Sequence, residues 1–171
     1  MKIEVVDHAG DPGVAAYSSS LQALGMAHEI LQHDEIRDFR HALEIMPLEL
    51  ADCVPTLLTM ADGVPLVVVV RGDRKADFKF LKKTLAIKDL RMATPAEFTA
   101  LTRLPVGTAR VFNPGLRTVL DSSLLEREFA IGGSGSFCYS IRYRCADLHR
   151  IPGGEFLDVA GPGTRRRLSE H

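Results

Sequence analysis

The hydrophobic pattern of this chain switches repeatedly between the period of a helix and that of a strand. Apolar residues recur at helical spacing in several segments, of which the first begins after Asp11 and ends at Gly25 and the second ends before Pro47. This spacing predicts helices over residues 12–24, 36–46, 76–85 and 94–102, with a short helical segment near 145–151. The clearest start lies at Thr94, where Pro95 and Glu97 complete the signature of a capping box.

Apolar runs of strand length separate these helices. Strands are predicted at residues 27–33, 53–60, 64–72, 89–93, 108–112, 118–121, 128–132 and 137–143. Asp62 followed by Gly63 predicts a tight hairpin, and the run "VPLVVVV" after it predicts a central strand that is apolar on both faces. Helices interleaved with hairpins and short strands favour a single α+β domain around a mixed sheet.

The composition is that of an ordinary globular protein. Of the 171 residues, 46% are hydrophobic and 25% are charged, which suits one domain that folds alone. The formal net charge of -1 excludes the strongly positive surface of a protein that follows a long phosphate backbone, so we expect no extended DNA binding. Contact with a single nucleic-acid end remains open.

Several classes of site and location are not expected. The longest purely apolar run, residues 64–70, is far shorter than the ~20 residues that a membrane-spanning helix needs. The start of the chain lacks the apolar core of a secretory signal and the three cysteines form no Cys-x-x-Cys pair, which predicts a cytoplasmic protein with reduced core cysteines. The histidines show no zinc spacing, so no metal and no cofactor are expected. A domain over residues 1–160 is followed by a predicted flexible basic tail, 161–171.

Two local features each allow a structural and a functional interpretation. The run "GGSGS" at residues 132–136 lies between two predicted strands, which favours a hairpin turn over a phosphate cradle, because a cradle normally leads into a helix. A glycine turn can also bring the backbone close to a ligand. Asp121, at the end of a strand, can cap the segment "SSLL" or act as an active-site carboxylate.

From about His33 to Leu148 the order of segments resembles the YbaK/prolyl-tRNA-synthetase-associated family of aminoacyl-tRNA editing deacylases. The matching pieces are "CVPTLL", "VPLVVVVRGDRKADFKFLKKTLAIKDLRMATPAEFTALT", "PVGTARVFNPG", "RTVLDSSL" and "AIGGSGS". The resemblance implies a mixed central sheet or a partly closed barrel with surrounding helices. It also implies a freestanding enzyme that binds the 3' end of a mischarged aminoacyl-tRNA and hydrolyses the ester at the terminal adenosine.

The resemblance assigns site residues position by position. Thr56 matches the threonine of the family's Lys-Thr pair, Gly107 matches a glycine of the loop along the aminoacyl pocket, and Asp121 matches an aspartate after a late strand. These three are the expected catalytic positions. The expected substrate-binding residues are Pro55, Thr108, Gly132, Gly133, Ser134 and Gly135.

Two positions depart from the family pattern. Pro55 stands where the family usually has a lysine, which removes a cation and a backbone N–H, and Val111 occupies the proline position of the Gly-x-x-x-Pro loop. An aminoacyl ester is already activated, so backbone N–H groups near Gly107 and the glycine turn can suffice to stabilise the oxyanion. We therefore expect an active deacylase. The alternative is a noncatalytic relative that binds a tRNA end, a nucleotide end or a partner protein.

Overall fold

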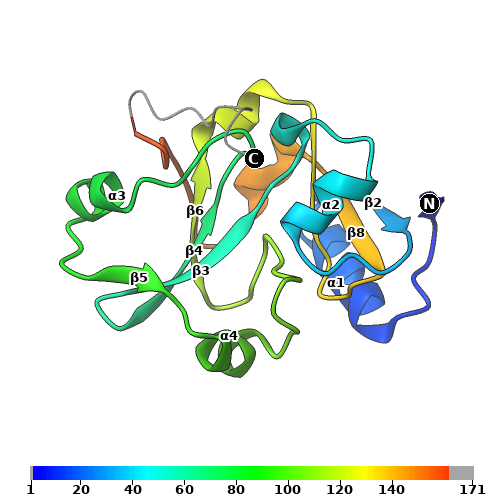
Figure 1. The fold of residues 1–171 in the computed structure, drawn as a ribbon, viewed down its shortest axis with the longest axis horizontal. Helices are drawn as coiled ribbons and strands as arrows, with labels where there is room; N and C mark the ends of the chain where they lie inside the picture. The colour runs from blue at the N-terminus through cyan, green and yellow to red at the C-terminus, as the bar shows by residue number, and fades with distance from the viewer. Residues whose placement is uncertain (1, 162–171) are drawn as a thin grey trace.

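Two β-sheets form the framework of the computed structural model, which describes residues 2–161 (Figure 1). The first sheet has the strand order β1-β2-β8-β7 and is antiparallel throughout. Its strands are β1 (Glu4–Val6), β2 (His28–Gln32), β7 (Phe129–Gly133) and β8 (Tyr139–Arg144). The strands β7 and β8 form an antiparallel hairpin. Gly132 and Gly133 end β7 and residues 134–136 lie in the connection to β8, so the strand-to-strand turn interpretation of "GGSGS" is confirmed.

The second sheet has the order β5-β3-β4-β6-β9 and is mixed. Its strands are β3 (Thr56–Ala61), β4 (Val64–Val69), β5 (Leu90–Met92), β6 (Arg117–Asp121) and β9 (Gly154–Leu157). The pairs β3–β4 and β3–β5 are antiparallel, whereas β4–β6 and β6–β9 are parallel. The predicted hairpin turn is present, since Asp62 and Gly63 both have positive φ between β3 and β4.

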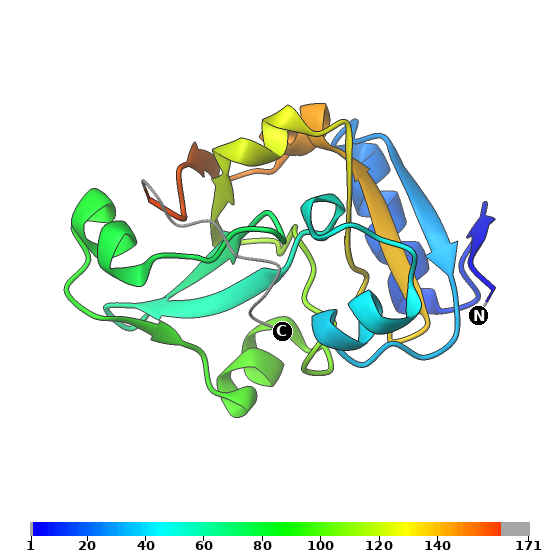
Figure 2. The same ribbon diagram turned by 45° about the horizontal axis from the view of Figure 1, so that its top comes forward.

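Within residues 2–161, four α-helices and three 3₁₀ segments connect the strands. They are α1 (Pro12–Ala23), α2 (Phe39–Ile45), α3 (Phe78–Leu85), α4 (Pro95–Thr102), η1 (Leu50–Asp52), η2 (Ser122–Glu126) and η3 (Cys145–Arg150). The capping box at Thr94 is present. Helix α2 begins later than predicted, because Asp38 has an extended backbone and caps the helix by accepting the N–H of His41. In Figures 1 and 2, α1 and α2 lie on different sides of β8.

Strand β4 lies at the centre of the core. It is flanked by β3 and β6, and its residues belong alternately to two hydrophobic clusters. Val67 and Val69 pack in the cluster that contains α1, whereas Leu66 and Val68 pack in the cluster that contains Leu81 of α3. The prediction of a central strand buried on both faces is confirmed.

Residues 108–112 are not the strand that their pattern predicts. Arg110 forms a single parallel bridge to Gly133, and the N–H of Phe112 donates to the hydroxyl of Tyr17 instead of to a neighbouring strand. Val111 is fully buried. The apolar residues of this segment therefore reflect burial beneath α1, which the pattern alone does not distinguish from strand pairing.

The fold is the α+β class with a mixed sheet that the sequence predicts, built here as two sheets. Two short strands were not predicted: β1 is exposed for most of its length, and β9 begins at a glycine. Cys53 and Cys145 are buried as expected, but Cys138 is exposed; all three are free thiols. Apart from Gly161, the predicted tail lies outside the described residues. Within residues 2–161, no helix has the length and apolar character needed to cross a membrane.

Candidate functional site

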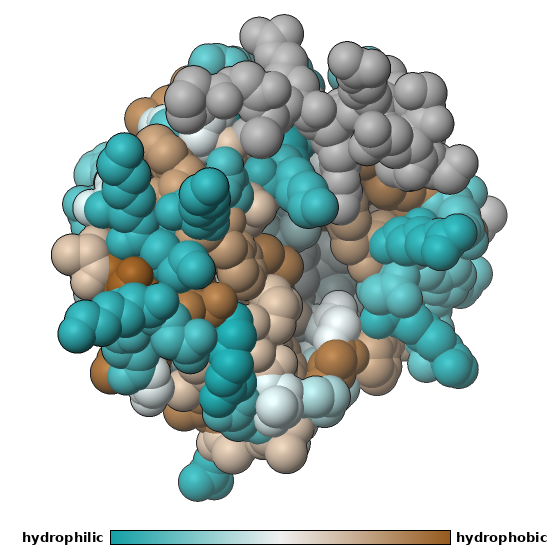
Figure 3. Space-filling model, turned by 60° about the vertical axis from the view of Figure 1, so that its left-hand side comes forward, coloured by the Kyte–Doolittle hydropathy of each residue, from teal (hydrophilic) through white to brown (hydrophobic). Residues whose placement is uncertain are grey.

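A cavity of about 600 Å³ is lined by residues from both sheets and from α2, α3 and α4. Figure 3 shows the molecule hollowed, with apolar side chains around the hollow and hydrophilic ones at its rim. The lining contains apolar side chains such as Phe39, Leu58, Phe98 and Phe137, together with a few polar groups. This combination of a mainly apolar wall with convergent polar groups is typical of a ligand site.

Pro55 and Thr56 line the cavity where the chain passes from one sheet to the other. The N–H of Val54 donates to the carbonyl of Ile131 on β7, and the carbonyl of Pro55 accepts the N–H of Val70 after β4. Pro55 precedes β3, so its missing N–H removes no bond from the interior of the β3–β4 ladder. Proline is therefore accommodated at this position without disrupting the sheet.

The loop that contains Gly107 and Thr108 forms a second part of the wall. Gly107 has φ +96°, and a Cβ atom there would lie 2.2 Å from the carbonyl oxygen of Arg37. Only glycine allows this approach between the loop and the segment that precedes α2. The hydroxyl of Thr108 donates to the carbonyl of Pro105, whereas no hydrogen bond within the described residues uses the N–H of Gly107.

The glycine turn completes this wall with Gly132 and Gly133. A Cβ on Gly133 would lie 2.3 Å from the carbonyl oxygen of Ala109, so the turn and the 107–110 loop are in direct backbone contact. Ser134 is fully buried and its hydroxyl donates to the carbonyl of Tyr139. Ser134 and Gly135 therefore support the turn from behind the cavity wall.

Arg110 ties the turn to α1. Its Nε donates to the carbonyl of Ser134 at 2.6 Å, and its guanidinium also donates to the carbonyl of Gly13. The same guanidinium lies 4.5 Å from the ring centre of Tyr17. Tyr17 and Tyr143 share a buried hydrogen bond of 2.6 Å, and burial raises the pKa of Tyr17 to about 12, so this pair stays uncharged. A partly buried polar network thus holds the glycine turn in place.

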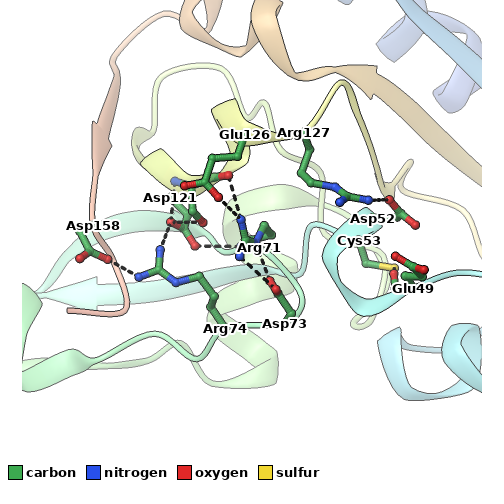
Figure 4. A network of polar contacts seen from close by, with 11 residues as sticks. Glu49, Asp52, Cys53, Arg71, Asp73, Arg74, Asp121, Glu126, Arg127 and Asp158 are labelled. Carbon is green, nitrogen blue, oxygen red and sulfur yellow. Dashed lines mark hydrogen bonds and ion pairs between the residues drawn. The ribbon is translucent and has the colours of Figure 1, made fainter. Parts of the chain in front are cut away.

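Asp121 does not line the cavity, but it is bonded to Arg74, which does (Figure 4). Its carboxylate is fully buried and accepts hydrogen bonds from the Arg71 N–H, the Arg74 guanidinium, and the N–H and hydroxyl of Ser123. The cap that the sequence allows for Asp121 is therefore present at η2. Arg74, which does line the cavity, is also paired with Asp158 at 2.5 Å.

The remaining charged and reactive groups of the lining differ in whether they can bind or attack a ligand. Lys75 is exposed and has no ion-pair partner among residues 2–161. Burial raises the pKa of the Cys53 thiol to about 12, so this side chain is a protonated thiol at neutral pH and a poor nucleophile. In the described part of the chain, no three His, Cys, Asp or Glu side chains gather as metal ligands would.

The structure brings six of the nine predicted site residues to this one cavity. They are Pro55, Thr56, Gly107, Thr108, Gly132 and Gly133. Asp121, Ser134 and Gly135 lie behind its wall, and the chemical roles of all nine stay predictions. The sequence interpretation missed Arg74 and Lys75, although polar residues directly after the buried run "VVVV" were a usable signal. It also missed His33 and Ser140, which are far apart in the sequence.

Three kinds of comparison relate this chain to known proteins. The family model of the aminoacyl-tRNA editing domain matches residues 33–151. A proline–tRNA ligase of Solidesulfovibrio magneticus is 37% identical over 93 residues, which are 53% of this chain and 16% of the ligase. A proline–tRNA ligase of Acidithiobacillus ferrooxidans is 28% identical over 126 residues, 74% of this chain and 21% of the ligase. The chain thus spans a small part of these relatives.

Solved structures show the same fold. A crystal structure described as a candidate trans-editing enzyme for prolyl tRNA synthetase aligns with TM-score 0.76 at 19% identity, covering 89% of this chain and 99% of the other. A crystal structure of a protein described only as hypothetical aligns with TM-score 0.76 at 24% identity, covering 84% and 97%. Because the family model matches more than half of it, this chain belongs to the aminoacyl-tRNA editing domain family. The resemblance seen in the sequence is confirmed.

Proposed function

We propose that this protein hydrolyses the ester of a mischarged aminoacyl-tRNA at the 3'-terminal adenosine, releasing the amino acid and the free tRNA. The observation that carries the proposal is the convergence of Pro55, Thr56, Gly107 and Gly132 on one apolar cavity in a chain of the editing-domain family. The relatives named as proline–tRNA ligases make a tRNA specific for proline the first substrate to test.

Ester hydrolysis asks little of the protein chemically. The ester is activated, and the attack needs a positioned water and donors for the oxygen that becomes negative. We assign one donor to the N–H of Gly107, which lines the cavity and has no partner within the described residues. Selectivity among amino acids would come from the apolar wall, where a hydrophobic pocket discriminates by about 1–3 kcal/mol per methylene.

Lys75 is proposed to supply the phosphate contact that the family's lysine would otherwise give. The charge of Arg74 is already balanced by Asp121 and Asp158, whereas Lys75 is exposed at the cavity and unpaired among residues 2–161. Lys75→Ala is expected to weaken tRNA binding and to lower the salt slope by about one phosphate contact. Lys83→Ala, on the exposed part of α3 away from the cavity lining, is the matched control.

The direct test is single-turnover hydrolysis of a panel of mischarged tRNAs, beginning with proline tRNA esterified with each non-cognate amino acid. We expect at least one ester to be cleaved faster than in buffer, and Pro55→Lys to change that rate only modestly. Pro55 itself favours a second candidate, a noncatalytic protein that binds the tRNA end. A folded wild-type protein that binds tRNA but cleaves no member of the panel would establish that alternative.

A further inference from the structure

His33 and Ser140 form a hydrogen-bonded pair on the cavity wall. His33 follows β2 and Ser140 lies on the neighbouring strand β8, where it is paired with Leu31 of β2. Their Nε2 and Oγ atoms are 2.8 Å apart, and both residues line the cavity. The other ring nitrogen of His33, Nδ1, lies 2.7 Å from the backbone carbonyl oxygen of Asp34.

The partners of His33 fix the direction of its hydrogen bonds. A carbonyl oxygen only accepts, so Nδ1 carries the proton of the neutral ring and Nε2 presents a lone pair. The hydroxyl of Ser140 therefore donates to Nε2. Consequently Oγ of Ser140 has only lone pairs left, and it can accept a hydrogen bond from a donor in the cavity.

The surroundings keep the ring in this neutral form at neutral pH. Burial lowers the pKa of His33, against a smaller upward effect of Asp34. Among residues 2–161, the other charged groups of the cavity lining are Asp38, Arg74 and Lys75. Two of these three are cations, and Arg74 is balanced by two carboxylates.

We propose that Ser140 and His33 form a proton relay for the water that attacks the ester, an inference that rests on the proposed deacylase function. The water oxygen bonds to the ester carbonyl carbon while its proton passes to Oγ of Ser140 and the Ser140 proton passes to Nε2 of His33. When the intermediate collapses, the bond from carbon to the ribose oxygen breaks. The proton then returns from His33 through Ser140 to the ribose oxygen, and the pair is restored.

The chain contains an internal control for this relay. Ser18 of α1 and His28 of β2 make the same arrangement, with Oγ and Nε2 2.7 Å apart and Nδ1 2.9 Å from the carbonyl oxygen of Met26. His28 is paired with Tyr143, on the face of the sheet that packs against α1, and neither Ser18 nor His28 lines the cavity. The two pairs share their chemistry and differ in access to the cavity.

The experiment compares Ser140→Ala and His33→Gln with Ser18→Ala and His28→Gln in single-turnover deacylation of the mischarged panel. We expect the cavity variants to lose about 10²–10⁴-fold in rate, the usual contribution of positioned acid–base groups, and the other two to keep the wild-type rate. Ser140→Ala removes only the hydroxyl oxygen and leaves the rest of the side chain in place. This variant therefore still tests the relay if His33→Gln does not fold. Circular dichroism checks that each variant is folded.

A pH profile distinguishes a proton relay from a structural role. The wild-type rate is expected to fall as the pH drops through the pKa of His33, which lies below the ordinary value of 6.5, because protonation removes the acceptor. Ser140→Ala should abolish this limb. A wild-type protein that cleaves no ester overturns the proposed function and the relay together. An active wild type whose cavity variants keep its rate and pH profile overturns the relay alone.

Discussion

The cavity has two walls that are held by different forces. Directly after β4, the segment with Arg71 and Arg74 is fixed by charge, since both arginines bond to carboxylates and Asp121 joins them (Figure 4). In the other part of the wall, Gly107 and Gly133 are fixed by backbone atoms in contact with other backbone atoms. The first wall should tolerate changes of shape better than changes of charge. The backbone wall should tolerate changes of uncharged side chains at other positions. At Gly107 and Gly133 themselves it should not tolerate even one added atom.

The largest expected effect is on the charged wall. Asp121→Ala leaves the guanidinium of Arg74 with Asp158 alone and deprives the Arg71 N–H of its acceptor. Removing one partner of a buried pair typically costs about 3–5 kcal/mol, which we expect as the loss in free energy of unfolding in urea. Asp158→Ala should cost less, because Asp158 is 44% exposed. Equal losses for the two variants would argue against Asp121 as the centre of this wall.

A single methyl group tests the backbone wall. Gly133→Ala places its Cβ 2.3 Å from the carbonyl oxygen of Ala109, so the turn or the loop must move. Overpacking of this kind costs about 1–3 kcal/mol, and we expect a loss of that size in urea unfolding. Gly10→Ala is the control, since its Cβ would meet only the Tyr139 hydroxyl at an ordinary 3.4 Å. A Gly133→Ala protein as stable as the control would show that the contact is adaptable.

The smallest expected effect on stability concerns the exposed N-terminal cap of α4. This helix contributes Pro95 and Phe98 to the cavity lining but belongs to neither the charged wall nor the backbone wall. Hydrogen bonds from Arg91 and from the Thr94 backbone lower the pKa of Glu97 to about 2, from the ordinary 4.5. A carboxyl whose pKa is lower in the folded state stabilises it above the unfolded pKa, and this contribution is lost as the pH falls from about 4.5 towards 2.

The stability difference between wild type and Glu97→Gln should therefore be small at pH 7 and smaller still near pH 2. Thermal unfolding midpoints at the two pH values measure it. Arg91→Gln is the matched control, because it removes the partner that donates to both carboxylate oxygens of Glu97 and leaves Glu97 itself in place. A difference that grows on acidification would contradict the assigned direction of the pKa shift.

Local chemistry explains which parts could be predicted from the sequence. The hairpin at Asp62 and the cap at Thr94 depend on residues within a few positions of each other, and both are present. Burial without pairing misled the interpretation of residues 108–112, because an apolar run looks the same in both cases. Contacts between distant positions were invisible: His33 and Ser140 are 107 residues apart, and nothing in their local sequence marks them as partners.

The ion pairs of Arg74 also bear on the order of events in folding. Arg74 joins residues 47 and 84 positions further along the chain, Asp121 at the end of β6 and Asp158 just after β9. Strand β6 pairs in parallel with β4, and β9 pairs in parallel with β6. Each parallel pair requires a long crossover connection between its two strands. Closing such long loops slows folding, because their entropy is lost before the contacts form. We therefore expect the charged wall to be completed late in folding, after the segment that precedes Asp158 has paired with β6. Until then Arg74 lacks its second carboxylate partner.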